Sequence, residues 1–417
     1  MRYILAPVGS AGDVHPFVAI GRRLRARGHD VAVVTAEPFG PLVERAGLTF
    51  LPSASAGEYD LATTNPELWH PRRGVRLVFD LATRTMRRMY EAIASLHEPG
   101  RTVLVGSTLA FAARVFEEVH RLPAATIDLA PNALRSAFQQ PVLEPGRDMT
   151  RWPRPLKRLF WWTVDRRVLD PLLGPPLNAW RAEFGLPPVQ RIFRDWVHSP
   201  QRIVGLYPDW FAPPQPDWPP QLRLAGFPLA GDGDATWPAA DLDAFLAQGR
   251  APLAFTAGSA NRLAHEFFSA AVEAARLLGR RALLLTRFAE QLPAQLPAEV
   301  RHVAWAPFST LLPRCAAVVH HGGIGTCAQG LAAGVPQLVV PMAYDQPDNA
   351  ARLVRLGVGA MLAPRQFTGA HAAGALGALL DSHDTADACA RWRDRLQHDD
   401  AVERVCDLLR ELEPPAR

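Results

Sequence analysis

Short apolar runs alternate with amphipathic stretches along most of this 417-residue chain, and this alternation is the strongest constraint on its fold. A strand that is covered on both faces reads as a continuous apolar run, and neighbouring parallel strands need a helical crossover between them. We predict ten such strands, at residues 2–8, 31–35, 48–51, 102–106, 124–128, 252–256, 282–286, 301–305, 316–321 and 336–341. The sequence therefore predicts an α/β protein with two doubly wound parallel sheets.

The alternation is interrupted near the middle of the chain. Residues 135–200 are rich in Trp, Pro and Arg, and we expect a helical insertion there. Segment 207–220 contains six prolines in fourteen residues, which excludes a helix or a central strand because proline lacks an N–H donor and has a fixed φ. The expected order is an N-terminal domain (1–212), an extended linker (213–220), a C-terminal domain (221–385) and C-terminal helices (386–417) that can cross back to the N-terminal domain.

Composition excludes several kinds of function. Lys157 is the only lysine, so the sequence contains neither a phosphate-binding loop of the G-x-x-x-x-G-K-[ST] type nor a credible Schiff-base lysine. The four cysteines include no C-x-x-C pair, and we predict no metal site. Arginine supplies all but one of the 45 Lys and Arg residues, and we attribute this bias to a GC-rich coding sequence. The net charge of +4 is therefore weak evidence for nucleic-acid binding, and we expect no nucleic-acid partner. With no leader sequence and no run of about 18 apolar residues, we expect a cytoplasmic protein.

The most specific loop follows the predicted strand at 316–321. That strand ends in two histidines, and Gly322, Gly323 and Gly325 then open a helix. Such a turn exposes backbone N–H groups at the positive end of the helix dipole, and His321 and Thr326 add two further donors. A diphosphate would fit this loop. The alternative is an ordinary glycine turn with packed histidines.

Two neighbouring elements carry a resemblance to a known family. Trp305-Ala306-Pro307, the loop from His321 to Thr326, and Asp345-Gln346 occur in the order and at the spacing of the nucleotide-sugar signature of family-1 glycosyltransferases. The chain resembles that family over nearly its whole length. The resemblance implies a GT-B fold, in which two Rossmann-like domains face each other across a cleft. It also implies a nucleotide-sugar co-substrate and no metal or other cofactor.

The resemblance assigns roles to individual residues. It implies that Trp305 stacks on the base, that His321, Gly323 and Thr326 contact the diphosphate with Ser259, and that Asp345 and Gln346 bind the sugar hydroxyls. The full set of expected donor-binding residues is Ser259, Trp305, Ala306, His321, Gly322, Gly323, Gly325, Thr326, Gln329, Asp345 and Gln346. Gln329 and Phe308 depart from the pattern of relatives that use uridine sugars, which favours a dTDP-sugar over a UDP-sugar.

The loop after the first strand, residues 8–16, opens the first predicted helix. Gly9 and Gly12 leave a dinucleotide-binding pattern incomplete, and Asp13 fits an N-cap whatever the function. In the resemblance, Asp13 stands where many relatives carry the histidine that deprotonates the acceptor, with His15 as the alternative base. Ser107 stands where such relatives carry the partner aspartate. The implied reaction is a single inverting displacement.

An aromatic and basic segment, residues 151–173, suits either a hydrophobic acceptor pocket or a helix on anionic headgroups at the inner membrane surface. The alternative is a core helix. Trp161 and Trp162, with Ser107, are the expected acceptor-binding residues. Segment 191–229 is similar to the bacterial rhamnosyltransferases of rhamnolipid synthesis, which implies transfer of L-rhamnose from dTDP-rhamnose to a lipid-like acceptor such as a 3-hydroxy-fatty-acid ester. The alternatives are transfer from a UDP-sugar to a sterol or polyketide-like molecule, a nucleotide-sugar epimerase, and a non-catalytic nucleotide-sugar-binding protein.

Overall fold

The computed structural model describes residues 1–70, 73–144, 149–229 and 240–414, and the chain divides into two compact units. Unit 1 comprises Met1–Pro141, Asp148–Pro228 and Asp400–Arg417. Unit 2 comprises Val142–Arg147 and Leu229–Asp399. Within the described ranges, no helix combines the length and the apolar character that crossing a bilayer requires.

Unit 1 is built on a seven-stranded parallel sheet with the order β3-β2-β1-β4-β5-β6-β7. Its strands are β1 (Arg2–Ala6), β2 (Asp30–Ala36), β3 (Thr49–Ala54), β4 (Thr102–Ser107), β5 (Ala124–Asp128), β6 (Ile203–Gly205) and β7 (Leu222–Leu224). The central strands β1, β4 and β5 are almost completely buried, as expected for a parallel sheet that helices cover on both faces. The strand order reverses between β1 and β4, so their carboxyl ends form the point at which such sheets bind ligands.

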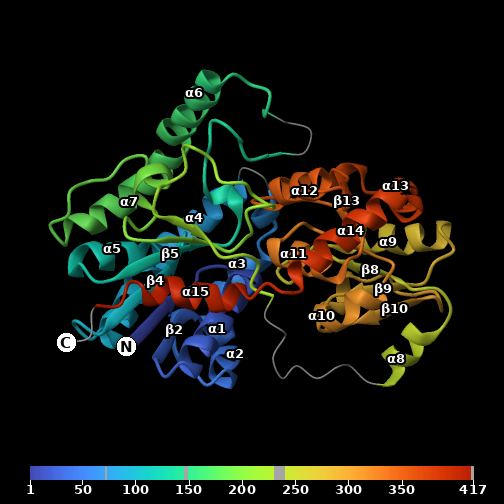
Figure 1. Ribbon diagram of the computed structural model, residues 1–417, viewed down its shortest axis with the longest axis horizontal. Coiled ribbons are helices and arrows are strands. Elements are labelled where there is room, and N and C mark those ends of the chain that lie inside the picture. The colour runs from blue at the N-terminus through green and yellow to red at the C-terminus, as the bar shows by residue number, and fades with distance from the viewer. Residues whose placement is uncertain (71–72, 145–148, 230–239, 415–417) are drawn as a thin grey trace. The chain divides into compact units, whose positions relative to one another are not determined.

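Eight α-helices belong to the described part of unit 1. They are α1 (Ala11–Ala26), α2 (Gly40–Arg45), α3 (Ala56–Thr64), α4 (Arg73–Leu96), α5 (Phe111–His120), α6 (Arg154–Val164), α7 (Asp170–Ala182) and α15 (Ala401–Arg410). The last of these comes from the C-terminal end of the chain and lies against α1 (Figure 1). Arg23 and Arg27 of α1 both form ion pairs with Glu403 of α15. Unit 1 thus contains both ends of the described chain.

Unit 2 has a six-stranded parallel sheet with the order β10-β9-β8-β11-β12-β13. The strands are β8 (Leu253–Thr256), β9 (Ala282–Leu285), β10 (Val300–Val303), β11 (Ala317–His320), β12 (Gln337–Val339) and β13 (Gly359–Met361). Its helices are α8 (Ala240–Ala247), α9 (His265–Leu277), α10 (Phe308–Leu311), α11 (Ile324–Ala333), α12 (Gln346–Arg355), α13 (Gly369–Asp381) and α14 (His383–Leu396). Here the order reverses between β8 and β11, which places the glycine-rich turn after β11 at the switch point.

The predicted pair of doubly wound parallel sheets is confirmed, and each of the ten predicted strands is present. Three strands of three residues each, β6, β7 and β13, were not predicted. The proline-rich segment 213–220 lies just before β7, which pairs with β6 inside unit 1. The division between the units falls later, after Pro228.

Candidate active site

The glycine-rich turn of unit 2 connects β11 to α11. Strand β11 ends at His320, and α11 begins at Ile324 with Gly323 as its N-cap. Gly322 has a φ of 94°, and a β-carbon there would lie 2.8 Å from Val339 Cγ1 and 3.1 Å from the carbonyl oxygen of Gln346. Only glycine fits this position, because it tolerates the left-handed conformation and leaves room for its neighbours. The turn leaves the N-terminus of α11 accessible, with Gly325 exposed.

The His321 ring lies between two glycines. A β-carbon on Gly258 would be 2.7 Å from Cε1 of the imidazole, and one on Gly323 would be 2.6 Å from Nε2. His321 Nδ1 is buried and has no hydrogen-bond partner within the described residues. Burial lowers the pKa of His321 to about 4, so the ring is neutral at pH 7. The structure therefore supplies a neutral imidazole with an unsatisfied nitrogen beside the α11 N-terminus, rather than a positive charge.

His320, which sequence reasoning passed over as a site residue, shapes this turn from beneath. Its side chain is fully buried. The Gly322 N–H donates to His320 Nδ1 at 3.1 Å, and Nε2 lies 2.9 Å from Gln337 Oε1. Burial lowers the pKa of His320 to about 3, with a further contribution from His321. The neutral ring can accept one hydrogen bond and donate the other, which fixes the path of the backbone at Gly322.

The acid-amide turn at the start of α12 contacts the same loop. Asn349 Nδ2 donates to the carbonyl oxygen of Gly322 at 2.9 Å and to Asp345 Oδ2 at 2.7 Å. Asp345 is partly exposed, and Tyr344 before it has a φ of 61°, a strained conformation that is common at functional turns. Asn349 thus orients the Asp345 carboxylate. Its position one helical turn after Asp345 was the only signal in the sequence that could have indicated this role.

Gln346 has a different environment from Asp345. Its side chain is 4% exposed, and its Oε1 accepts hydrogen bonds from the Met342 and Ala343 N–H groups at 2.8 and 3.1 Å. These two bonds hold the turn before α12. An interaction of Gln346 with a sugar would therefore use its amide nitrogen.

The remaining expected donor-binding residues lie along the carboxyl edge of the unit 2 sheet. Ser259 is exposed in the turn after β8, where its carbonyl oxygen accepts from Arg287 at 3.0 Å. Trp305 follows β10 and is 48% exposed, whereas Ala306 is buried. Thr326 and Gln329 are partly exposed on α11. The accessible indole of Trp305 suits a base, and the N-terminus of α11 suits a diphosphate. Both lie at the carboxyl edge of the sheet, where a sugar attached to the diphosphate would also lie.

In unit 1, Asp13 occupies the third position of α1 rather than the N-cap expected from the sequence. The N-cap is Ser10. The Asp13 carboxylate reaches back to accept from the Ser10 N–H at 2.6 Å and from Ser10 Oγ at 3.0 Å, as in a capping box. Burial raises the pKa of Asp13, while the two hydrogen bonds from Ser10 act in the opposite direction. His15, two residues further on, is exposed.

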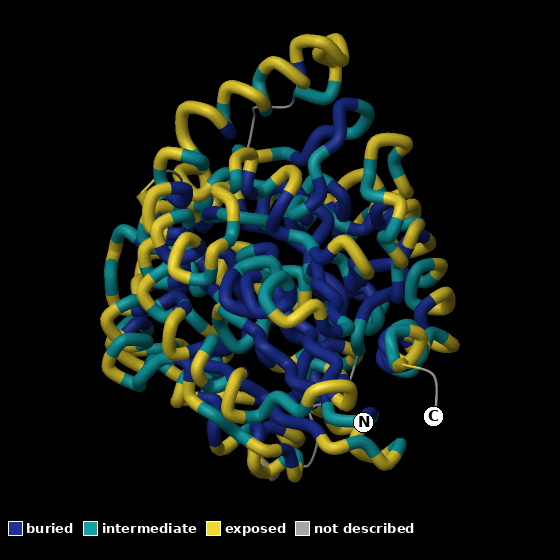
Figure 2. The backbone as a smooth tube through the Cα atoms, turned by 90° about the vertical axis from the view of Figure 1, so that its left-hand side faces the viewer, coloured by how far each residue is buried: buried dark blue, intermediate teal, exposed yellow. Residues whose placement is uncertain are grey.

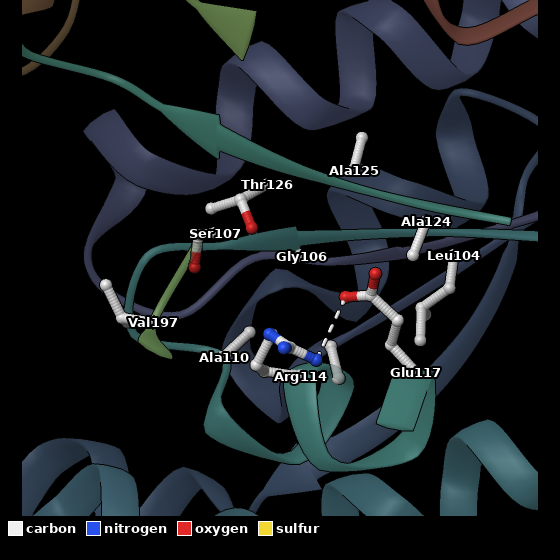
Figure 3. Close-up of a pocket in the computed structure, with 11 residues that line it drawn as sticks. Leu104, Gly106, Ser107, Ala110, Arg114, Glu117, Ala124, Ala125, Thr126 and Val197 are labelled. Carbon is white, nitrogen blue, oxygen red and sulfur yellow. Dashed lines mark ion pairs between the residues drawn. The ribbon is translucent and has the colours of Figure 1, made fainter. Parts of the chain in front are cut away.

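Ser107 ends β4 next to this loop. Its Oγ accepts a hydrogen bond from the Val8 N–H at 3.0 Å. Figure 3 shows Ser107 and Thr126 on neighbouring strands, where they line a small cavity together with the Arg114–Glu117 ion pair. The cavity volume of about 10 Å³ is enough for one water molecule at most, so this space is not an acceptor pocket.

A buried acid beside Ser107 was also missed by sequence reasoning. Asp128, at the end of β5, is fully buried and accepts from Thr108 Oγ1 at 2.7 Å. His198 Nε2 lies 3.0 Å from the other carboxylate oxygen. These contacts connect the end of β4 to the segment that follows α7, and thereby fix the turn that carries Ser107.

Of the two expected acceptor tryptophans, Trp161 lies on the inner side of α6, where the Arg135 guanidinium is 4.4 Å from its ring centroid. Trp162 is exposed. Within the described residues, no group of three or more His, Cys, Asp or Glu side chains is arranged to hold a metal ion.

Two doubly wound units, one with a glycine-rich turn and helix N-terminus at its switch point, define the GT-B class of glycosyltransferases. Residues 3–139 match the glycosyltransferase family 28 N-terminal domain, and residues 282–412 match the C-terminal domain of proteins like erythromycin biosynthesis protein CIII. The chain is 35% identical to O-mycaminosyltylonolide 6-deoxyallosyltransferase of Streptomyces fradiae over 99% of its own length and 97% of that relative. This chain therefore belongs to the family-1 GT-B glycosyltransferases.

Solved structures agree with this fold. The glycotransferase of kitacinnamycin superposes with a TM-score of 0.75 at 22% identity, covering 99% of both chains. The spinosyn rhamnosyltransferase SpnG complexed with thymidine diphosphate superposes with a TM-score of 0.68 at 20% identity, covering 98% of this chain and all of that one. The expected family and GT-B fold are thus confirmed.

Proposed function

We propose that this glycosyltransferase moves a deoxysugar from a dTDP-sugar to a hydroxyl group of a hydrophobic small molecule. The observation that carries the proposal is the position of the His321 ring between Gly258 and Gly323, where its unsatisfied nitrogen adjoins the N-terminus of α11. Neutral donors and a helix N-terminus suit a diphosphate, which becomes the leaving group of sugar transfer. The accessible indole of Trp305 supplies a surface on which a base can stack.

The choice of dTDP has two supports. Gln329 and Phe308 replace residues that relatives using uridine sugars often carry, and a less demanding ribose site suits a deoxyribose. Two solved structures with the same fold, VinC and SpnG, are described as complexes with dTDP and thymidine diphosphate. We propose L-rhamnose as the sugar, which the resemblance of segment 191–229 implies; SpnG is likewise named a rhamnosyltransferase.

In the proposed reaction, Asp13 takes the proton of the acceptor hydroxyl as the new glycosidic bond forms. The oxygen attacks the anomeric carbon, the bond from that carbon to the diphosphate breaks, and the configuration inverts. Hydrogen bonds from Ser10 and the α1 dipole favour the ionised form of Asp13, whereas burial raises its pKa, and a raised pKa makes the carboxylate a stronger base. His321, Thr326 and the α11 N–H groups stabilise the negative charge of the departing diphosphate without a metal ion.

Our first candidate acceptor is a lipid-like molecule such as a 3-hydroxy-fatty-acid ester, as in rhamnolipid synthesis. We also propose a cytoplasmic location with peripheral contact at the inner face of the membrane, where such an acceptor would accumulate. A macrolide or other polyketide is the second candidate, because the Streptomyces fradiae relative is named for transfer to O-mycaminosyltylonolide.

The test combines donors with acceptors and identifies the product by mass spectrometry. Purified protein is incubated with dTDP-rhamnose or UDP-glucose and with a 3-hydroxydecanoyl ester or a macrolide aglycone. We expect a rhamnosylated ester. A product found only with the aglycone would replace the first acceptor class by the second. A changed sugar nucleotide without acceptor would indicate an epimerase, and donor binding without any product would indicate a binding protein.

A further inference from the structure

The side of α6 that is turned toward the rest of unit 1 carries the buried Lys157 beside the partly buried Phe160, Trp161 and Val164. Lys157, the only lysine, is 2% exposed, and its Nζ donates to the carbonyl oxygens of Thr150 at 2.7 Å and Phe138 at 3.3 Å. Asp165, just after the helix, is also buried and forms an ion pair with Arg135. Buried charges normally need such partners. Buried charged groups with partners therefore help to hold this side of α6 against the rest of unit 1.

The opposite side of α6 is apolar and open. Leu156 is 50% exposed and Leu159 is 56% exposed, and the two are one helical turn apart on α6. Trp152, 44% exposed, lies just before the helix. Of the exposed large hydrophobic side chains in the described part of the chain, almost half lie between residues 152 and 168; they are Trp152, Leu156, Leu159, Trp162 and Val168. Figures 1 and 2 show α6 extending beyond the rest of unit 1, with most of its length exposed. We call these five side chains, of which Trp152 lies just before the helix and Val168 just after it, the outer face of α6.

Within segment 151–173, which the structure describes in full, the exposed charged side chains are all positive. Arg151, Arg154, Arg158, Arg166 and Arg167 are exposed, at intervals along the same segment. Its two acidic residues are engaged elsewhere, since Asp165 pairs with Arg135 and Asp170 accepts from the backbone N–H groups of Arg191 and Ile192. Exposed apolar side chains bordered by arginines complement a membrane surface, in which acyl chains lie beneath anionic headgroups.

We propose that the outer face of α6 lies on a bilayer that contains anionic lipid. Leu156, Leu159 and Trp152 reach the boundary of the acyl chains, and the arginines bind the phosphates of the headgroups. This contact rests on the proposed function only for its purpose, which is to bring unit 1 to a lipid-like acceptor. Trp161 does not take part, because its ring lies on the inner side beside Arg135.

The experiment is co-sedimentation of the full chain with vesicles of equimolar phosphatidylglycerol and phosphatidylcholine. We expect the wild-type chain to pellet, and the partition coefficient of Leu156→Gln/Leu159→Gln to fall at least tenfold. Leu61→Gln is the matched control, because Leu61 is a 74% exposed leucine on α3 of the same unit. Its partition coefficient should stay within twofold of the wild-type value. Arg158→Glu/Arg166→Glu should lose binding, as should wild-type protein with pure phosphatidylcholine vesicles.

Equal pelleting of the double leucine variant and the wild type would overturn the proposal, as would equal binding to both kinds of vesicle. A wild-type dimer that dissociates in the double leucine variant, measured by sedimentation velocity, would show that a second copy covers the face and would also overturn it. Calorimetric binding of dTDP should be the same in all variants, which verifies their folding. Vesicle binding without sugar transfer to any acceptor would contradict the proposed function and leave the membrane contact standing.

Discussion

Replacing Gly323 by alanine tests whether the position of the His321 ring determines binding of the donor nucleotide. The added β-carbon would lie 2.6 Å from Nε2 and 3.1 Å from Cε1 of the imidazole. Non-bonded carbon atoms pack at about 3.5–4.0 Å, so the ring must move by about 1 Å. The φ of Gly323 is −59°, which alanine adopts without strain. The variant should therefore displace the ring while the backbone keeps its conformation.

The expected loss follows from that displacement. A hydrogen bond of about 2.9 Å that lengthens by about 1 Å is no longer a bond, and bonds to charged groups contribute about 1.5–3 kcal/mol. The dissociation constant for dTDP should therefore rise about 10- to 150-fold. Overpacking around the His321 ring should also lower the free energy of unfolding by about 1–3 kcal/mol.

The assay is isothermal titration calorimetry with dTDP on the wild type, Gly323→Ala, His321→Ala and the double variant. If Gly323 acts through the ring, the double variant binds no more weakly than His321→Ala alone, because the displaced group is already gone. Gly374→Ala is the control: its β-carbon meets open space in α13, so dTDP affinity should be unchanged. Losses that add in the double variant would refute the reasoning, since the methyl group would then act on the ligand itself. Wild-type affinity in Gly323→Ala would refute it equally.

Three further outcomes are expected. Burial lowers the pKa of His320 from 6.5 to about 3, so as the pH falls this histidine is protonated in the unfolded chain before it is protonated in the folded one. The free energy of unfolding should therefore drop by about 2 kcal/mol between pH 7 and 5 because of this residue. Urea denaturation that gave the same pH dependence for wild type and His320→Gln would contradict this. Asp13→Asn keeps an oxygen that can accept from Ser10, so its melting temperature and dTDP affinity should remain near wild type while turnover falls at least about a hundredfold; His15→Ala should be milder, and the reverse pattern would transfer the role of base to His15. In calorimetric titrations, dTDP should bind at least as tightly as UDP, and a clear preference for UDP would remove the argument from Gln329 and Phe308.

The strands that sequence analysis located are those with buried apolar runs, whose pattern reflects burial on both faces. Strands β7 and β13 contain no fully buried residue and so lack such a run, and β6 has only three residues. Ile203–Gly205 becomes a strand because β5 offers it free backbone groups, and that is a property of the assembled sheet. Local sequence carries no such information.

The candidate site shows the same limit. The glycine turn was recognisable because its residues are consecutive, but Asn349 reaches Gly322 across 27 positions of sequence. For α6, the amphipathic pattern was visible, yet apolar residues normally mark the inner side of a helix. Here the inner side also takes Lys157 and Asp165, because they find partners in Phe138 and Arg135 earlier in the chain, and Leu156 and Leu159 stay exposed.

The return of the C-terminal helix to unit 1 has a consequence for engineering. Val405, Cys406 and Leu409 of α15 are fully buried, and Glu403 pairs with arginines of α1. Most of unit 2 is thus an insertion into unit 1, bounded by Pro228/Leu229 on one side and Asp399/Asp400 on the other. A chimaera made by joining two relatives at a single crossover near residue 229 would combine α1 of one parent with α15 of the other. Exchanging the nucleotide-binding half between relatives therefore calls for two crossovers, with residues 400–414 taken from the parent that supplies α1.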